Sequence, residues 1–190
     1  WFQNPNEYIT TEGISINEGL SLSGDVSLFV ENKIKLKEFI ELDLGSRFMT
    51  YATSGMYKRF FEPRLQLNIK PSSKHLLNIS YMSVHQSSQL LRTQGDIMQN
   101  EIWLAADEKI PLSVSEQYSA GWNYLFYSNA LEFTLLFYYK LMDNLIEFRE
   151  GYSFMQGDLN WREKIESDGK GESNGIELSL RKQQGRLTGY

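Results

Sequence analysis

Apolar and polar residues alternate with a period of two along most of the chain. Between residues 61 and 69 the odd positions are apolar or proline and the even positions are polar. Successive side chains of a β-strand point to opposite faces, so this alternation predicts strands with one apolar and one polar face. No segment of comparable length carries the 3.6-residue repeat of an amphipathic helix. The sequence therefore predicts an all-β protein.

Eight segments carry the alternation strongly enough to be read as strands. They are residues 25–33, 39–51, 59–69, 75–86, 115–126, 130–142, 176–183 and 186–190. We expect the apolar residues of 61–69 and 131–137 to share one continuous face of an antiparallel sheet. Pro63 lies in the middle of a predicted strand and has no N–H to donate, so a bulge or weak pairing is expected there.

The connections between these strands alternate between short and long. Short links fall at 35–38, 70–74, 127–129 and 183–185, and long ones at 52–58, 87–114 and 143–175. In an antiparallel meander this order places every short link at one end of the strands and every long one at the other. Up-and-down barrels of the outer membrane have this asymmetry, with short periplasmic turns and long extracellular loops.

The lengths of the strands and their aromatic residues also favour a membrane barrel. Strands of about 9 to 13 residues match a tilted transmembrane strand and exceed the roughly 5 to 6 residues usual in soluble sheets. Aromatic residues gather near strand ends, as interfacial girdles do. These are Phe48, Tyr51, Phe60, Phe61, Tyr124, Phe126, Tyr138 and Tyr139. Since a soluble β-sandwich with an aromatic core would also alternate, it remains the alternative.

Composition excludes several other classes of protein. The 190 residues include 19 basic and 24 acidic side chains, for a net charge of -5, with no basic cluster of the kind that binds nucleic acid. No apolar run approaches the roughly 18 to 20 residues of a membrane-spanning helix. There is no cysteine, and His75 and His85 fall at opposite ends of one predicted strand, about 33 Å apart, so they cannot share a metal. We expect no metal, no cofactor and no enzymatic activity.

Four strings along the chain resemble a known family. They are Phe61-Glu62-Pro63-Arg64-Leu65, residues 115–121 (SEQYSAG), residues 138–146 (YYKLMDNLI), and Gly175-Ile176-Glu177-Leu178 followed by residues 185–190 (GRLTGY). In order and spacing, from about Asp25 onward, they resemble the C-terminal barrel half of TonB-dependent outer-membrane receptors, particularly those with a carboxypeptidase-regulatory-like segment.

The resemblance implies that the chain is part of a larger receptor. Such receptors have a barrel of about 22 strands, a plug in its lumen and a TonB box. Residues 1–190 would then be a single partial barrel segment of about eight or nine strands, lacking the plug and the TonB box. Implied partners are outer-membrane lipid, the TonB complex acting through the plug, a nutrient such as a sugar, peptide or metal chelate, and a surface lipoprotein. The alternative is a soluble, aromatic-rich β-sandwich that binds a ligand.

An unclosed sheet must hide its edges and apolar face in another way. We expect either a curved open sheet, paired with another chain or with the rest of the receptor, or a sheet collapsed on a copy of itself. Both long loops should leave from the same end.

The long loops hold the candidate ligand-binding residues. Loop 143–175 carries eight acidic and four basic residues together with Tyr152, Phe154 and Trp161, and loop 87–114 carries Arg92 and Trp103. Aromatic faces stack on ligand rings while charged groups form hydrogen bonds. We therefore expect these five residues to contact the nutrient, and we expect no catalytic residue.

Overall fold

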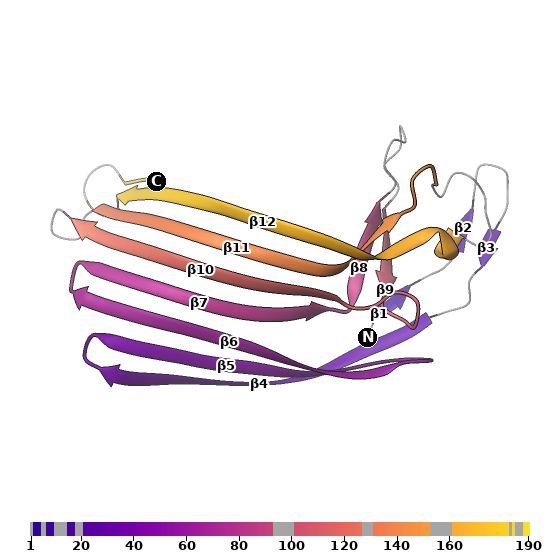
Figure 1. Cartoon of the computed structure of the whole chain (residues 1–190), viewed down its shortest axis with the longest axis horizontal. Coiled ribbons are helices and arrows are strands. Elements are labelled where there is room, and N and C mark those ends of the chain that lie inside the picture. The colour runs from indigo at the N-terminus through magenta and orange to yellow at the C-terminus, as the bar shows by residue number, and fades with distance from the viewer. Residues whose placement is uncertain are drawn as a thin grey trace.

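The protein is one curved, open antiparallel sheet with two small hairpin-like sheets at one end (Figure 1). The computed structural model describes residues 2–4, 7–9, 15–17, 21–92, 101–126, 131–152, 161–182, 184 and 188–190. The eight strands of the main sheet follow the order β1-β4-β5-β6-β7-β10-β11-β12. The predicted all-β, antiparallel meander is confirmed, as an open sheet and not a closed barrel.

The bounds of the strands are as follows. The main sheet comprises β1 (Phe2–Asn4), β4 (Ser21–Lys37), β5 (Ile40–Thr53), β6 (Tyr57–Ser72), β7 (His75–Gln86), β10 (Ser113–Phe126), β11 (Leu131–Phe148) and β12 (Ile165–Lys182). The small sheets are β2 (Glu7–Ile9) with β3 (Ser15–Asn17), and β8 (Ser88–Arg92) with β9 (Glu101–Ala105). A 3-10 turn, η2 (Trp161–Lys164), precedes β12. The described residues include no helix long and apolar enough to cross a membrane.

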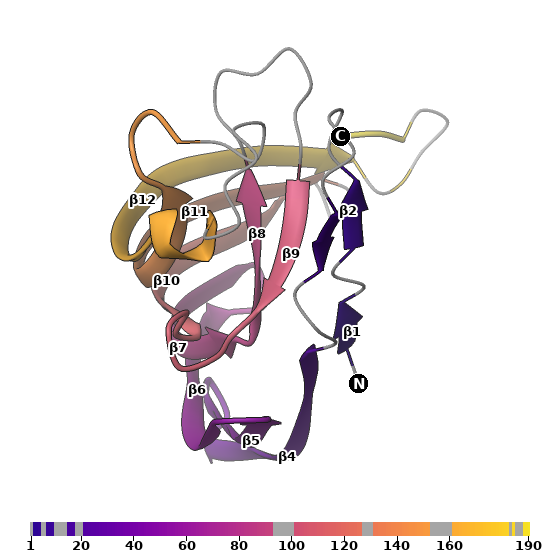
Figure 2. The same cartoon turned by 90° about the vertical axis from the view of Figure 1, so that its right-hand side faces the viewer.

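The predicted alternation sorts the side chains onto two faces. In register, Leu65 lies opposite Leu44 on β5 and Tyr81 on β7, and the same row continues through Tyr118 and Tyr139. These apolar rows form the convex face. The polar rows lie on the concave face, over which the β8–β9 hairpin folds (Figure 2). The expected continuous apolar face is confirmed.

The apolar part of the convex face has a constant height, and we call it the apolar belt. On five strands it spans nine residues: Val26–Ile34, Ile40–Phe48, Phe61–Ile69, Tyr118–Phe126 and Leu131–Tyr139. Of the positions that face outward in these stretches, only Asn32, Ser46 and the hydroxyl groups of three tyrosines (Tyr118, Tyr124 and Tyr139) are polar. The belt is open to the surroundings, with Val26 76% and Leu178 69% exposed. Because no second sheet covers it, the described residues do not form a sandwich.

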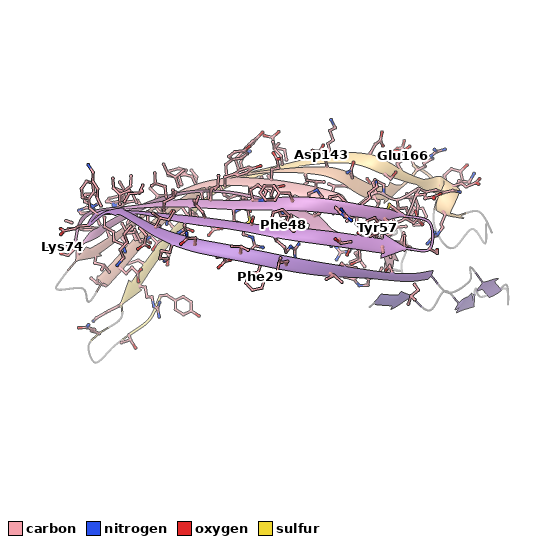
Figure 3. All side chains as sticks on the ribbon, turned by 90° about the horizontal axis from the view of Figure 1, so that it is seen from below. Phe29, Phe48, Tyr57, Lys74, Asp143 and Glu166 are labelled. Carbon is pink, nitrogen blue, oxygen red and sulfur yellow. The ribbon has the colours of Figure 1, made fainter. Side chains whose placement is uncertain are left out.

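The links at one end of the sheet, here called the turn end, are tight. Residues 38–39 join β4 to β5 and residues 73–74 join β6 to β7. Lys74 marks this end in Figure 3, and Tyr57 and Glu166 mark the opposite, loop end. The β8–β9 hairpin and η2 both lie at the loop end, as predicted for the two longest connections (Figure 1). The link predicted at 127–129 lies outside the described residues.

Strands at the loop end run further than predicted. The expected long link at 52–58 is wrong, because β5 and β6 are joined by residues 54–56 alone and the Thr53 N–H donates to the Met56 carbonyl at 2.9 Å. Likewise β11 continues to Phe148 and β12 starts at Ile165, which shortens the predicted loop 143–175 to residues 149–164. The added part of β12 is polar on both faces, so the sequence has no alternation there that would predict a strand.

Two smaller expectations concern Pro63 and the end of the chain. The β5–β6 ladder passes Pro63 opposite Ser46 without a shift, whereas the β6–β7 ladder stops at Arg64 opposite Met82. The weak pairing predicted at Pro63 is therefore found on its β7 side. The strand predicted over 186–190 falls partly outside the described residues. Within them, Gly189 forms a single antiparallel bridge with Lys182.

Candidate functional site

The buried core lies at the loop end, on the concave side of the sheet. Residues 106–112, which we call the inner loop, leave β9 and cross toward β5 and β6. They contribute to two apolar clusters. One contains Leu91, Leu104, Ile110 and Ile165, and the other contains Met49, Tyr51, Met56, Ala106 and Leu112. The inner loop thus fills the hollow of the curved sheet at its loop end.

Hydrogen bonds from three strands fix the inner loop. The Tyr51 hydroxyl of β5 donates to the Ala106 carbonyl at 2.7 Å. The side-chain amide of Gln89 on β8 donates to the carbonyls of Pro111 and Asn144, each at 3.0 Å. The side chain of Asn144 in turn donates to the Leu112 carbonyl at 3.0 Å. These bonds satisfy carbonyls that the loop leaves unpaired, which buried backbone requires.

An ion pair closes the exposed side of the loop. Arg162 of η2 donates to Asp107 at 2.7 Å. The other carboxylate oxygen of Asp107 accepts the N–H groups of Lys109 and Ile110, at 2.8 and 2.9 Å. The Ser167 hydroxyl donates to the Lys109 carbonyl at 3.2 Å. Asp107 therefore shapes the loop and ties it to η2, while the Ser167 bond ties it to β12.

Asn144 owes its place to a break in the β11–β12 ladder. The register shifts between Met142 and Leu145, and Asn144 has φ of 59°. Asparagine is among the few non-glycine residues that adopt this left-handed conformation readily. The bulge turns its backbone carbonyl and side chain toward Gln89 and Leu112.

Replacing Gln89 with alanine should loosen the inner loop without unfolding the sheet. Gln89 is buried, and its loss leaves the carbonyls of Pro111 and Asn144 unpaired, at a cost of about 1 to 3 kcal/mol. Limited proteolysis near Glu108 and Lys109 should become faster. Gln86→Ala is the control, because Gln86 lies on the neighbouring strand and is exposed. Water can take over the hydrogen bonds of its side-chain amide when that amide is removed. Equal cleavage rates for Gln89→Ala and Gln86→Ala would contradict the expected role.

The structure brings some of the predicted ligand-binding residues to one end of the sheet. Arg92 and Trp103 lie on the β8–β9 hairpin, paired with Glu101 and Leu90. Trp103 is 48% exposed. Both lie at the loop end with η2, which starts at Trp161.

The other predicted residues belong to the connection between β11 and β12. Tyr152 follows the turn at Gly151, is 41% exposed and lies under the Lys164 ammonium, which is 4.8 Å from the centre of its ring. The Arg149 N–H donates to the Lys164 carbonyl at 2.8 Å, which closes the base of this connection. Phe154 and the side chain of Trp161 lie outside the described residues, so their contact with a ligand stays a prediction.

A buried charge cluster lies where β6 and β7 part. Glu62 is fully buried and accepts a hydrogen bond from Arg47 Nε. Its other oxygen accepts the His85 backbone N–H at 2.6 Å and lies 3.3 Å from His85 Nδ1. The Phe60 ring packs on His85, with 4.3 Å between ring centres. Glu62 thus takes up an N–H that the interrupted ladder leaves free.

A polar network covers the concave face nearer the turn end. Lys33 lies 3.1 Å from Glu41 and 3.5 Å from Asp43, and Asn68 donates to Asp43 at 2.9 Å. Cross-strand ion pairs therefore join β4 to β5 at Lys33 and β5 to β6 at Arg47 and Glu62. Sequence reasoning missed Gln89 and Asn144, whose partners are 22 to 55 residues away in the sequence. No group of three or more metal-ligating side chains occurs among the described residues.

No protein-family model matches the sequence, and no curated protein does. Solved structures are similar in fold. The alcaligin outer-membrane receptor FauA from Bordetella pertussis matches with a TM-score of 0.57 at 17% identity, over 86% of this chain and 28% of that one. The FrpB iron transporter from Neisseria meningitidis gives 0.62 at 12% identity, over 90% of this chain and 25% of that one. The siderophore receptor PirA from Acinetobacter baumannii gives 0.60 at 15% identity, over 93% and 29%.

These matches concern the fold, because the identities are low. The chain spans about a quarter of the length of the proteins that it resembles. They are outer-membrane receptors and transporters, as the resemblance in the sequence implied at the level of the class. The carboxypeptidase-regulatory-like type stays a prediction. The fold of this chain is similar to a section of these receptors and transporters.

Proposed function

We propose that this chain is part of the barrel wall of a TonB-dependent outer-membrane receptor that imports a nutrient, and that it has no enzymatic role. The nine-residue apolar belt carries the proposal. At about 3.3 Å per residue it is about 30 Å long, and a tilted transmembrane strand needs about 9 to 11 residues. A polar concave face behind an exposed apolar belt suits a wall with lipid outside and a hydrated lumen inside.

The orientation follows from the links. Tight turns belong at the periplasmic side and larger connections outside the cell. The turn end would then face the periplasm, and the inner loop, the β8–β9 hairpin and η2 would lie at the extracellular mouth. The rest of the barrel would pair with the free edge of β12 and with the edge of β4 beyond the three residues that pair with β1, because an unpaired edge is not tolerated in lipid.

Cysteine labelling tests the location and orientation. The 190 residues contain no cysteine, so single cysteines report one site each within them. In the intact receptor, Lys58→Cys should react with a membrane-impermeant maleimide on whole cells. Ser73→Cys should react only after the outer membrane is permeabilised, and Ile79→Cys, 58% exposed in the belt, only after detergent is added. Equal labelling of all three in a soluble fraction would reject the proposal and favour a soluble module.

The first class of nutrient to test is an iron chelate. The similar proteins are receptors for alcaligin, ferric catecholate and ferric enterobactin. An exposed tryptophan and tyrosine beside arginine and lysine at the mouth offer stacking and charge to an anionic chelate. Sugars and peptides use aromatic stacking as well and are the comparison ligands.

Replacing Trp103 with alanine should weaken chelate binding by about tenfold, the effect of losing about 1.4 kcal/mol at an aromatic contact. The measurement is a binding titration of the purified receptor with a panel of ferric chelates. Phe48→Ala is the control, because Phe48 is 52% exposed but lies on the convex face. Unchanged binding in Trp103→Ala would remove this residue from the site.

A further inference from the structure

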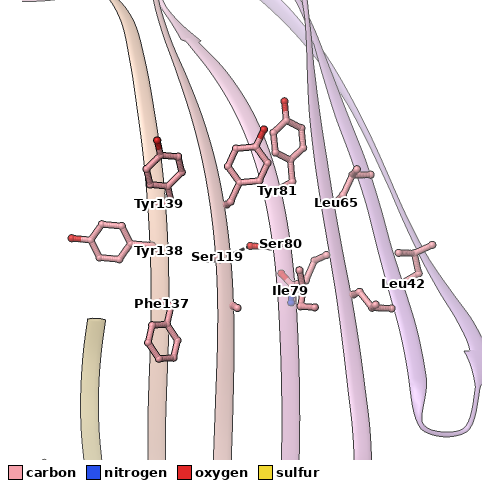
Figure 4. Close-up of a pocket in the computed structure, with 13 residues that line it drawn as sticks. Leu42, Leu65, Ile79, Ser80, Tyr81, Ser119, Phe137, Tyr138 and Tyr139 are labelled. Carbon is pink, nitrogen blue, oxygen red and sulfur yellow. Dashed lines mark hydrogen bonds between the residues drawn. The ribbon is translucent and has the colours of Figure 1, made fainter. Parts of the chain in front are cut away.

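The convex face carries a trough in the middle of the belt. It has a volume of about 560 Å³ and is lined from β5 to β11 (Figure 4). Ala120 forms its floor, since Ala120 is the smallest side chain in its row and lies between Ile79 on β7 and Phe137 on β11. Ile79 and Phe137 are 58% and 46% exposed and stand on either side of it. Beneath the floor, on the opposite face, the hydroxyls of Ser80 and Ser119 are 2.6 Å apart and hydrogen-bonded.

A row of tyrosines ends the trough toward the loop end. Tyr81, Tyr118 and Tyr139 are neighbours in register on β7, β10 and β11, and the rings of Tyr81 and Tyr118 are 5.0 Å apart. The labelled rings of Tyr81 and Tyr139 point their hydroxyls in the same direction, away from Phe137 and Ile79 (Figure 4). The trough is therefore apolar along its length and polar at one end.

Two carboxylates follow the tyrosines on the same face. Glu116 and Glu172 flank Leu141 in the next row, on β10 and β12. The strand spacing places them about 10 Å apart. The Tyr81 hydroxyl donates to Glu116 at 3.2 Å, and Glu172 interacts with the Tyr139 hydroxyl. Within the described residues neither carboxylate has a salt-bridge partner. An apolar trough thus ends at a negative, hydrogen-bonding rim.

We propose that this trough binds one acyl chain of a lipid whose headgroup carries a primary ammonium group. The chain lies over Ala120 between Ile79 and Phe137, and the ammonium lies at Glu116 and Glu172. The charge of the rim selects this headgroup, because two carboxylates attract an ammonium group. They repel a headgroup whose phosphate is not accompanied by a positive group of the same lipid. The site rests on the proposed membrane location. The trough itself is lined from β5 to β11, inside the edges of the sheet, whereas Glu172 lies on the edge strand β12.

Native mass spectrometry of the intact receptor in detergent tests the site. Phosphatidylethanolamine, phosphatidylcholine and phosphatidylglycerol with identical acyl chains serve as probes. The unaltered receptor should retain one phosphatidylethanolamine in preference to the other two. Ala120→Phe should fill the trough and lower this retention by about tenfold. Ala120→Leu, a smaller intrusion, keeps the test open should the phenylalanine variant not fold. Val26→Phe, an outward position on β4, should retain the lipid as before.

The headgroup has its own variant. Glu116→Gln with Glu172→Gln should keep a lipid bound but abolish the preference for the ammonium. The proposal is overturned if Ala120→Phe and Ala120→Leu retain lipid as the unaltered receptor does, or if phosphatidylglycerol is retained as well as phosphatidylethanolamine. A receptor that does not fractionate with the outer membrane would instead refute the proposed function. Fractionation therefore separates the two failures.

Discussion

Replacing Leu135 with arginine is expected to remove most of the receptor from the outer membrane, whereas the same change at Leu136 is tolerated. Leu135 lies at the middle of the belt on β11, between Trp122 and Leu178. An arginine at the bilayer midplane on the lipid face costs about 2 to 4 kcal/mol. Leu136 points to the concave face, where it lies between Gly121 and Glu177, so its arginine gains water and a carboxylate.

The two variants differ only in the face that receives the charge. The measurement is the amount of each variant that fractionates with the outer membrane and migrates as a folded barrel in unheated gels. Equal loss in both would show that β11 tolerates no charge on either face, and equal recovery would show that the convex face does not meet lipid.

Replacing Glu62 with alanine is expected to destabilise the loop end by about 3 kcal/mol, near the lower bound for breaking a buried ion pair. The change leaves the Arg47 guanidinium and the His85 N–H without their acceptor. The lower bound applies because the Arg47 side chain is 29% exposed to solvent. Urea unfolding of the receptor in lipid vesicles, with and without the substitution, measures the loss.

A second variant tests the cause. In Arg47→Leu with Glu62→Leu both charges are absent, so part of the stability should return, because a buried pair replaced by apolar groups is often neutral. Glu41→Ala is the control for a pair with one exposed partner, since the Lys33 side chain is 62% exposed and that of Glu41 is 17% exposed, and it should cost less than Glu62→Ala because Lys33 reaches water. A loss for Glu41→Ala as large as for Glu62→Ala would show that burial is not what makes the Glu62 pair important.

The alternation in the sequence was enough to predict the belt, because successive residues of a strand point to opposite faces and one face of this sheet is apolar and the other polar. Leu65, Leu67 and Ile69 had their face assigned correctly for this reason. The prediction failed where the alternation ends. Residues 166–174 of β12 are polar on both faces, so the backbone ladder with β11 forms there without any pattern in the side chains. The β5–β6 turn was missed because Met56 is buried by inner-loop residues about 50 positions later.

The candidate site was less predictable than the fold. Aromatic and charged residues in long connections are a signal of composition, and three residues chosen by it, Arg92, Trp103 and Tyr152, lie at the loop end, while their contact with a ligand stays a prediction. The residues that fix the inner loop gave a weaker signal. Asn144 interrupts the alternation of β11, but its bond to Leu112 depends on a fold of the inner loop that only the three-dimensional structure reveals. Gln89 has no local signature at all.

The short ladder between β6 and β7 divides the sheet into two blocks. It holds six consecutive residue pairs, from Arg64–Met82 to Ile69–Leu77, whereas thirteen join β5 to β6 and twelve join β7 to β10. Beyond this ladder, the His85 N–H of β7 donates to the Glu62 carboxylate of β6 and not to a backbone carbonyl. When the protein is pulled mechanically, β6 and β7 should therefore separate first, with β4–β6 leaving as one three-stranded unit. Hydrogen exchange in deuterium oxide should likewise be fastest along the boundary between β6 and β7.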